Sequence, residues 1–177
     1  MSDSSNIKEL LEQAWSERRV GNYDQARRLV ERAEALTKDD NYNSLGRIFH
    51  VYAQFDSEHN RYPEALDLYR KSLENYKKAD VSDKIAHSTR HVADVLRKLG
   101  NDAESEAAYR EAIEVYRANP NSSSGDLANA LAGFAEILEK RGKISEAIAA
   151  WEETKELYQQ CGIQAGVEQA KRKLDSF

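Results

Sequence analysis

The sequence predicts an all-α protein built from a tandem array of helical hairpins. Its composition is typical of helix, because the 177 residues include only two prolines and eight glycines. Apolar residues recur at helical spacing through most of the chain. Small residues also return in a regular pattern, and this internal repeat is the observation that most directly predicts the fold.

Four pairs of small side chains mark the repeat. The two members of each pair are twelve positions apart, whereas the gap from one pair to the next is 27, 28 and then 30 positions. A constant spacing within pairs and a variable spacing between them predict rigid hairpins joined by adjustable loops, because two helices approach closely only where their side chains are small. The pairs are Ala14 and Ala26, Ala53 and Ala65, Ala93 and Ser105, and Ala135 and Ala147.

The first hairpin is expected at about residues 7–37. Its first helix carries an apolar stripe at helical spacing, and Gly21 supplies the left-handed residue that often ends a helix. Asn22 is expected to cap the second helix through its side chain, with Gln25 as its partner three residues later.

Three further hairpins are expected at about residues 43–78, 83–118 and 126–160. Their internal turns carry Asn60, Gly100 and Gly142, residue types that tolerate a left-handed backbone. Over residues 163–175, apolar side chains at helical spacing lie beside three basic ones, which predicts a helix that caps the stack. We expect residues 1–177 to form one domain.

The segments that enter the second helices share a motif of a turn, a small residue, an aromatic residue and another small residue. They read GNYDQARRLVERA from Gly21, NRYPEALDLYRKS from Asn60, GNDAESEAAYREA from Gly100 and GKISEAIAAWEET from Gly142. This motif resembles the tetratricopeptide repeat (TPR) family, and the period of about 40 residues resembles the repeats of kinesin light chains. Ser105 and Thr154 depart from the family pattern, and three units lack the terminal proline. The resemblance implies a right-handed α-solenoid of four TPR hairpins plus a C-terminal capping helix.

Composition excludes several classes of function. A formal net charge of −5 argues against a nucleic-acid-binding protein, which normally carries a basic excess. No apolar run approaches the roughly 18 residues of a membrane span, and the N-terminus lacks the features of a signal peptide. Cys161 is the single cysteine, so no disulfide forms within the chain. We expect a cytoplasmic monomer that binds neither nucleic acid nor membrane.

The family resemblance implies a non-enzymatic scaffold that binds another protein. In TPR proteins the first helices of successive hairpins line a concave groove that holds a peptide or a partner segment. Carried over by alignment, the groove candidates are Arg47, His50, Gln54, His87, Arg90, His91, Asp94, Asn129 and Glu136.

The predicted groove gathers three of the four histidines of the chain together with Arg47 and Arg90. A basic patch on an acidic protein favours an anionic ligand, so we expect an acidic or carboxylate-bearing peptide. The alternative is a solvated polar face with no ligand. Gly133 also has two interpretations, since it either leaves room for a ligand or allows close helix packing.

The alternative function is a metal-dependent or other enzyme that uses His87, His91 and Asp94. Two histidines at positions i and i+4, with an aspartate one turn later, are able to hold a metal. Arg90 on the same helix face opposes a cation there, so we expect no metal, no cofactor and no catalytic residue. Trp15 and Trp151 are expected to fill the core.

Overall fold

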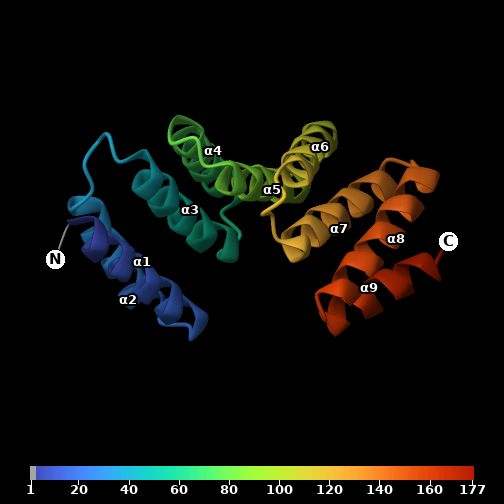
Figure 1. Cartoon of the computed structure of the whole chain (residues 1–177), viewed down its shortest axis with the longest axis horizontal. Helices are drawn as coiled ribbons and strands as arrows, with labels where there is room; N and C mark the ends of the chain where they lie inside the picture. The colour runs from blue at the N-terminus through green and yellow to red at the C-terminus, as the bar shows by residue number, and fades with distance from the viewer. Residues whose placement is uncertain (1–2) are drawn as a thin grey trace. The chain divides into compact units, whose positions relative to one another are not determined.

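The structure is a computed structural model that describes residues 3–177. These residues form nine α-helices and no strand, which confirms the all-α prediction (Figure 1). The first eight helices form four antiparallel hairpins, followed by one C-terminal helix. The hairpins are α1 (Asp3–Arg19) with α2 (Tyr23–Ala35), α3 (Tyr42–Glu58) with α4 (Tyr62–Lys78), α5 (Ser82–Lys98) with α6 (Asp102–Ala118), and α7 (Ser124–Lys140) with α8 (Ile144–Gln160). The C-terminal helix is α9 (Gln164–Leu174).

The chain divides into two compact units. Unit 1 comprises Met1–Lys84 and holds the first two hairpins, and unit 2 comprises Ile85–Phe177 and holds the last two hairpins and α9. The first three residues of α5 belong to unit 1. The expectation that residues 1–177 form one domain stays a prediction.

The turn inside each hairpin has the left-handed residue that the sequence predicts. The backbone φ is +84° at Gly21, +59° at Asn60, +79° at Gly100 and +72° at Gly142. The amide of the next residue then bonds back to the end of the first helix, as from Asn101 to the carbonyl of Leu96 at 2.9 Å. Each first helix is thereby terminated in the same way, so the four hairpins share one turn geometry.

The predicted capping box at the start of α2 is wrong. The side chain of Asn22 makes no cap hydrogen bond. Its amide instead donates to the carboxylate of Glu17 at 2.7 Å, and the side-chain oxygen of Gln25 accepts from Arg28. Both side chains are therefore held by neighbouring charged groups rather than by the helix terminus.

All eight small residues of the repeat are fully buried, at 0% exposure. They lie where the paired helices approach each other. The departure at Ser105 is accommodated because its hydroxyl donates to the carbonyl of Ala93 at 2.9 Å. Serine at this buried position therefore carries no unsatisfied hydroxyl.

The two tryptophans have opposite environments. Trp151 is fully buried in the core of unit 2, as predicted. Trp15 is 46% exposed, so the prediction that it fills the core is wrong. The apolar stripe of α1 that packs on α2 ends at Ala14, and Trp15 lies beyond its edge under the guanidinium of Arg19, 4.6 Å from the ring centre.

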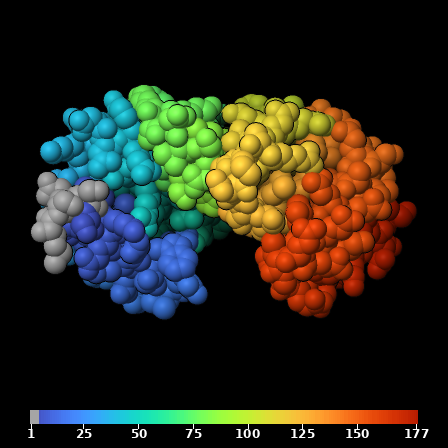
Figure 2. All heavy atoms as spheres, viewed as in Figure 1, coloured from blue at the N-terminus to red at the C-terminus, as the bar shows by residue number. Residues whose placement is uncertain are grey.

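The C-terminal helix α9 packs along α8 within unit 2 (Figures 1 and 2). Val167 and Ala170 are buried in this contact, and Gly166 lies against the ring of Tyr158. Lys173 also pairs with Glu139 of α7 at 2.8 Å. The helix therefore covers apolar surface of the last hairpin, as a capping helix is expected to do.

Candidate functional site

A set of polar side chains from α5 and α7 lies in unit 2. Apolar and small residues of α5, such as Val92 and Leu96, are buried, and the polar residues on the rest of the helix stay partly exposed. We call this set the α5–α7 face. It comprises His87, Arg90, His91, Asp94, Arg97, Asp126, Asn129 and Glu136.

Arg90 joins Asp94 and His91 in the middle of the α5–α7 face. Its Nη1 donates to Oδ2 of Asp94 at 2.7 Å, and its Nη2 lies 2.8 Å from Nε2 of His91. A guanidinium only donates, so Nε2 of His91 accepts and the ring proton sits on Nδ1, which faces Asp94 at 3.6 Å. Burial opposes the charge of Arg90, but Asp94 and the neighbouring Tyr116 outweigh it and raise the pKa of the guanidinium.

Tyr109 of α6 connects Asp94 to a second ion pair, that of Arg97 and Glu136. Its hydroxyl donates to Oδ1 of Asp94 at 2.5 Å and accepts from Nε of Arg97 at 3.3 Å. Arg97 in turn pairs with Glu136 of α7 at 2.5 Å. Asp94 thus bonds to both Arg90 and Tyr109. Tyr109, which is fully buried, therefore organises the face from within the core.

Gly133 of α7 allows Tyr109 to reach this position. A Cβ atom on Gly133 would lie 2.4 Å from the Tyr109 hydroxyl and 2.5 Å from the adjacent ring carbon. Of the two interpretations of Gly133, close packing therefore holds, and the space beside its Cα is occupied by the phenol.

Two further tyrosines support the polar residues of the face. The hydroxyl of Tyr158 donates to the side-chain oxygen of Asn129 at 2.8 Å, which orients the exposed amide of Asn129. Tyr116 is buried beside Arg90, and burial raises its pKa to about 12. Both phenols are therefore neutral at physiological pH.

Most charged side chains of the α5–α7 face lie beside a partner of opposite charge. Arg90 pairs with Asp94, Arg97 pairs with Glu136, and Nδ1 of His87 lies 4.0 Å from a carboxylate oxygen of Asp126. Neither Arg97 nor Asp126 is among the residues predicted from sequence. Arg97 lies one turn after Asp94 and was detectable as its neighbour, whereas Asp126 comes from another helix and has no local signal.

The other predicted residues lie on α3 of unit 1. His50 is buried, with its ring edge-to-face against Tyr69 at 5.2 Å. Arg47 and Gln54 are half-buried on the same helix. The structure thus places the nine predicted residues in two groups, three in unit 1 and six on the α5–α7 face. Their role as ligand contacts stays a prediction.

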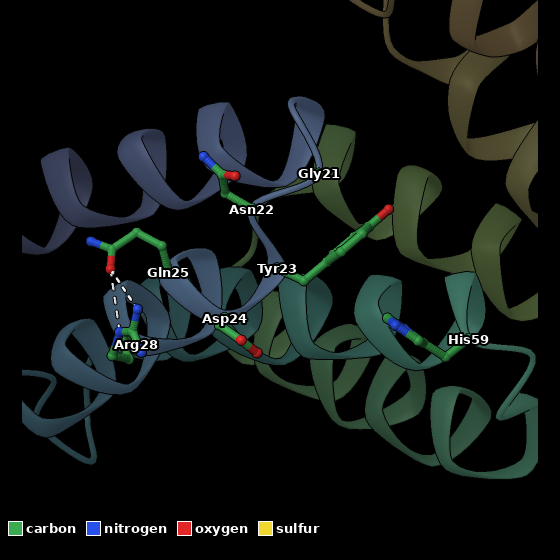
Figure 3. A pocket seen from close by; sticks show the side chains of 7 residues that line it. All are labelled: Gly21, Asn22, Tyr23, Asp24, Gln25, Arg28 and His59. Carbon is green, nitrogen blue, oxygen red and sulfur yellow. Dashed lines mark hydrogen bonds between the residues drawn. The ribbon is translucent and has the colours of Figure 1, made fainter.

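Unit 1 also contains an open cavity of about 520 Å³ at the turn between α1 and α2 (Figure 3). The rings of Tyr23 and His59 meet edge-to-face on one side of it, 5.3 Å apart. On the other side Gln25 is hydrogen-bonded to Arg28. None of the residues predicted to bind a ligand lines this cavity.

Comparison with known proteins decides the family. The sequence matches the family described as "Tetratricopeptide repeat" over residues 10–78 and 84–160. The chain belongs to the tetratricopeptide repeat family. The resemblance inferred from the four turn segments is thereby confirmed. No curated protein matches the sequence of this TPR chain.

Solved structures share the TPR fold at low sequence identity. BtubC (BKLC) from P. vanneervenii is 15% identical, with a TM-score of 0.69, and the match covers 96% of this chain and 87% of BtubC. Apo RapI is 14% identical with a TM-score of 0.85, and aspartyl phosphate phosphatase F from Bacillus subtilis is 13% identical with a TM-score of 0.74. These two matches cover 97% and 95% of this chain, which spans 62% of RapI and 44% of the phosphatase. The likeness is one of fold.

Among the described residues, no helix is both long enough and apolar enough to cross a membrane.

Proposed function

We propose that this TPR chain is a non-enzymatic protein-interaction module whose α5–α7 face binds an extended segment of a partner protein. TPR arrays use their stacked helices as extended binding surfaces, and membership of the family supports this class of function. The observation that carries the proposal is the organisation of the face by Tyr109. A buried phenol that holds Asp94 and Arg97 keeps polar groups in place before a ligand arrives.

The finer part of the proposal is a preference for an acidic or carboxylate-bearing segment. The guanidinium of Arg90 has the planar geometry that matches a carboxylate, and the exposed amide of Asn129 is suited to the main chain of a peptide. Asp94 and Glu136 would repel a bare anion. The partner therefore needs hydrogen-bond donors beside its carboxylate, and a peptide supplies these as main-chain N–H groups.

In unit 1, Arg47, His50 and Gln54 of α3 are proposed as further ligand contacts. They occupy positions of the repeat equivalent to His87, Arg90 and Asp94. We also retain the proposal of a monomeric cytoplasmic protein that binds neither nucleic acid nor membrane, supported by the net charge of −5. No catalytic role is proposed.

Selection from a random peptide display library on the immobilised full chain tests the function. We expect enrichment of acidic peptides, and the affinity of a selected peptide is then measured by fluorescence anisotropy. Arg90→Ala, Asn129→Ala and Arg47→Ala should each weaken binding, the arginine variants by about tenfold or more, because charge-assisted hydrogen bonds contribute about 1.5–3 kcal/mol. Arg172→Ala, at an exposed arginine of α9, is the matched control and should leave affinity unchanged.

Salt and circular dichroism complete the test. Affinity should fall as salt is raised, because exposed charges are screened. Each variant should keep the helical spectrum of the parent chain. A selected peptide whose binding is indifferent to salt and to all three substitutions would contradict the proposed site.

A further inference from the structure

Two histidines one turn apart on α5 face a carboxylate of α7. We propose that His87, His91 and Asp126 form a binding site in unit 2 for a divalent transition metal of the zinc class. This inference is independent of the proposed peptide binding, since it rests on the geometry of three side chains. It revises the expectation from sequence that the chain holds no metal.

His87 lies close to both of the other side chains. The rings of His87 and His91 meet edge-to-face with centres 4.7 Å apart, and one nitrogen of each ring lies within 4.8 Å of the other. Nδ1 of His87 is 4.0 Å from Oδ1 of Asp126. Two ligand atoms of tetrahedral zinc, each about 2.0–2.2 Å from the ion, are roughly 3.3–3.5 Å apart. Binding therefore requires His87 and Asp126 to approach by about half an ångström, and the two imidazole rings to turn until their nitrogens reach the same separation.

The site is accessible from solvent. The side chains of His87 and Asp126 are 33% and 39% exposed, so an ion reaches them without unfolding. Ligands made of imidazole and carboxylate favour zinc, cobalt and nickel over calcium and magnesium, which prefer oxygen alone.

The positively charged guanidinium of Arg90 lies beside His91. Its guanidinium donates to Asp94 and bonds to Nε2 of His91. An ion that binds His91 must displace one nitrogen of Arg90, and the guanidinium then remains held by Asp94 alone. Arg90 is thus an internal competitor that weakens metal binding.

The aspartate in the site is not the one that sequence spacing indicates. Asp94 lies on the same helix as both histidines but is bound by Arg90 and by Tyr109. Asp126, in the first turn of α7, takes its place. A metal held by these three ligands ties α5 to α7, and so joins the third and fourth hairpins within unit 2.

Titration of the full chain with Co²⁺ and Zn²⁺, prepared without a polyhistidine tag, tests the site. We expect one equivalent of Co²⁺ to bind with visible absorption bands of low-coordinate cobalt, and Zn²⁺ to displace it. His87→Ala, His91→Ala and Asp126→Asn should each lower the affinity at least tenfold. Arg90→Gln should raise the affinity several-fold, because it removes the internal competitor.

His59→Ala is the matched control, since His59 is the histidine of unit 1 whose ring bonds to the carbonyl of its own helix at Phe55. Affinity should be unchanged in this variant. The absence of a stoichiometric cobalt spectrum would overturn the site. Binding that survives Asp126→Asn undiminished would also overturn it, because it would reveal only an exposed histidine pair. Asp126→Asn keeps the size of an exposed side chain, and circular dichroism verifies that the variant is folded.

Discussion

Three tyrosines of the second helices each lie against a glycine. Tyr76 packs on Gly46, Tyr109 on Gly133 and Tyr158 on Gly166, and a Cβ atom on each glycine would lie 2.4–2.8 Å from the ring or hydroxyl. An aromatic ring is rigid and has little room to move in a packed core. These contacts therefore determine where the phenol groups lie, and Tyr109 in turn positions the charges of the α5–α7 face.

Gly133→Ala should destabilise the protein. Overpacking of a core costs about 1–3 kcal/mol, whereas the better helix propensity of alanine offsets about 1 kcal/mol of this. We expect a net loss of about 1 kcal/mol in the free energy of unfolding, measured with urea. Gly125→Ala in the same helix is the control, because its added Cβ would meet only ordinary contacts at 3.5 Å. Equal stability of the two variants would contradict the packing of Tyr109.

Burial of the tyrosines predicts a loss of stability at alkaline pH. Burial raises the pKa of Tyr116 to about 12 in the folded chain, from about 10 in the unfolded one. The folded state thus binds the phenol proton more tightly. The stability that the protonated phenol contributes is complete below about pH 10 and is lost as the pH rises from 10 to 12. Two pKa units correspond to about 2.7 kcal/mol.

Denaturant unfolding between pH 8 and pH 11.5 tests this prediction. Tyr116→Phe should reduce the alkaline loss of stability, because phenylalanine has no proton to release. Tyr23→Phe, at a 40% exposed tyrosine, should leave the loss unchanged. An equal response of the two variants would show that Tyr116 titrates as an ordinary phenol.

At the scale of the helices, α9 protects the last hairpin. Val167 and Ala170 are buried against α8, and Lys173 reaches Glu139 of α7. The exposed side of α9 carries Lys171 and Arg172. One helix therefore presents an apolar side to the stack and a charged side to solvent, which is the property that keeps the end of a repeat array soluble.

Removal of the chain from Ile163 onward should lower the melting temperature and promote aggregation. The deletion exposes the surface that Val167 and Ala170 cover, and exposed apolar patches favour association. Thermal unfolding and size-exclusion chromatography measure the two effects. The double variant Lys171→Ala/Arg172→Ala controls for lost charge and should behave like the parent chain. A truncated protein that is monodisperse and equally stable would mean that α9 is not a cap.

At the scale of the whole molecule, the measurable property is the cooperativity of unfolding between the two units. We propose that residues 1–177 behave as one domain. Neighbouring repeats stabilise one another through their interfaces, so an array of this length is expected to unfold in one cooperative transition.

The two tryptophans allow a direct test, because Trp15 belongs to unit 1 and Trp151 to unit 2. In Trp15→Phe the fluorescence reports on Trp151 alone, whereas circular dichroism averages over all helices. The two unfolding midpoints in urea should coincide. Trp15 is partly exposed, so its replacement should cost little stability. Separate midpoints would show that the units unfold independently.

Helical periodicity, small residues at a spacing of twelve and left-handed turn residues are local properties, and for this reason the sequence alone determined the helices, the hairpins and the family. The pairs from Ala14 to Ala147 and the turns at Gly21, Asn60, Gly100 and Gly142 lie as predicted. The amphipathic stripe of residues 163–175 likewise predicted α9.

Only the tertiary structure decided how the polar side chains pair. Spacing along α5 placed Arg90 and Asp94 on one face. The phenol of Tyr109, fifteen residues after Asp94, determines which charged groups remain available to a ligand. Asp126 approaches His87 from another helix. Trp15 directly follows Ala14, the last residue of α1 in the core, and lies outside the core. Hydrogen bonds and ion pairs between helices depend on distances that no local pattern encodes, so these groupings became visible only after the helices had been packed.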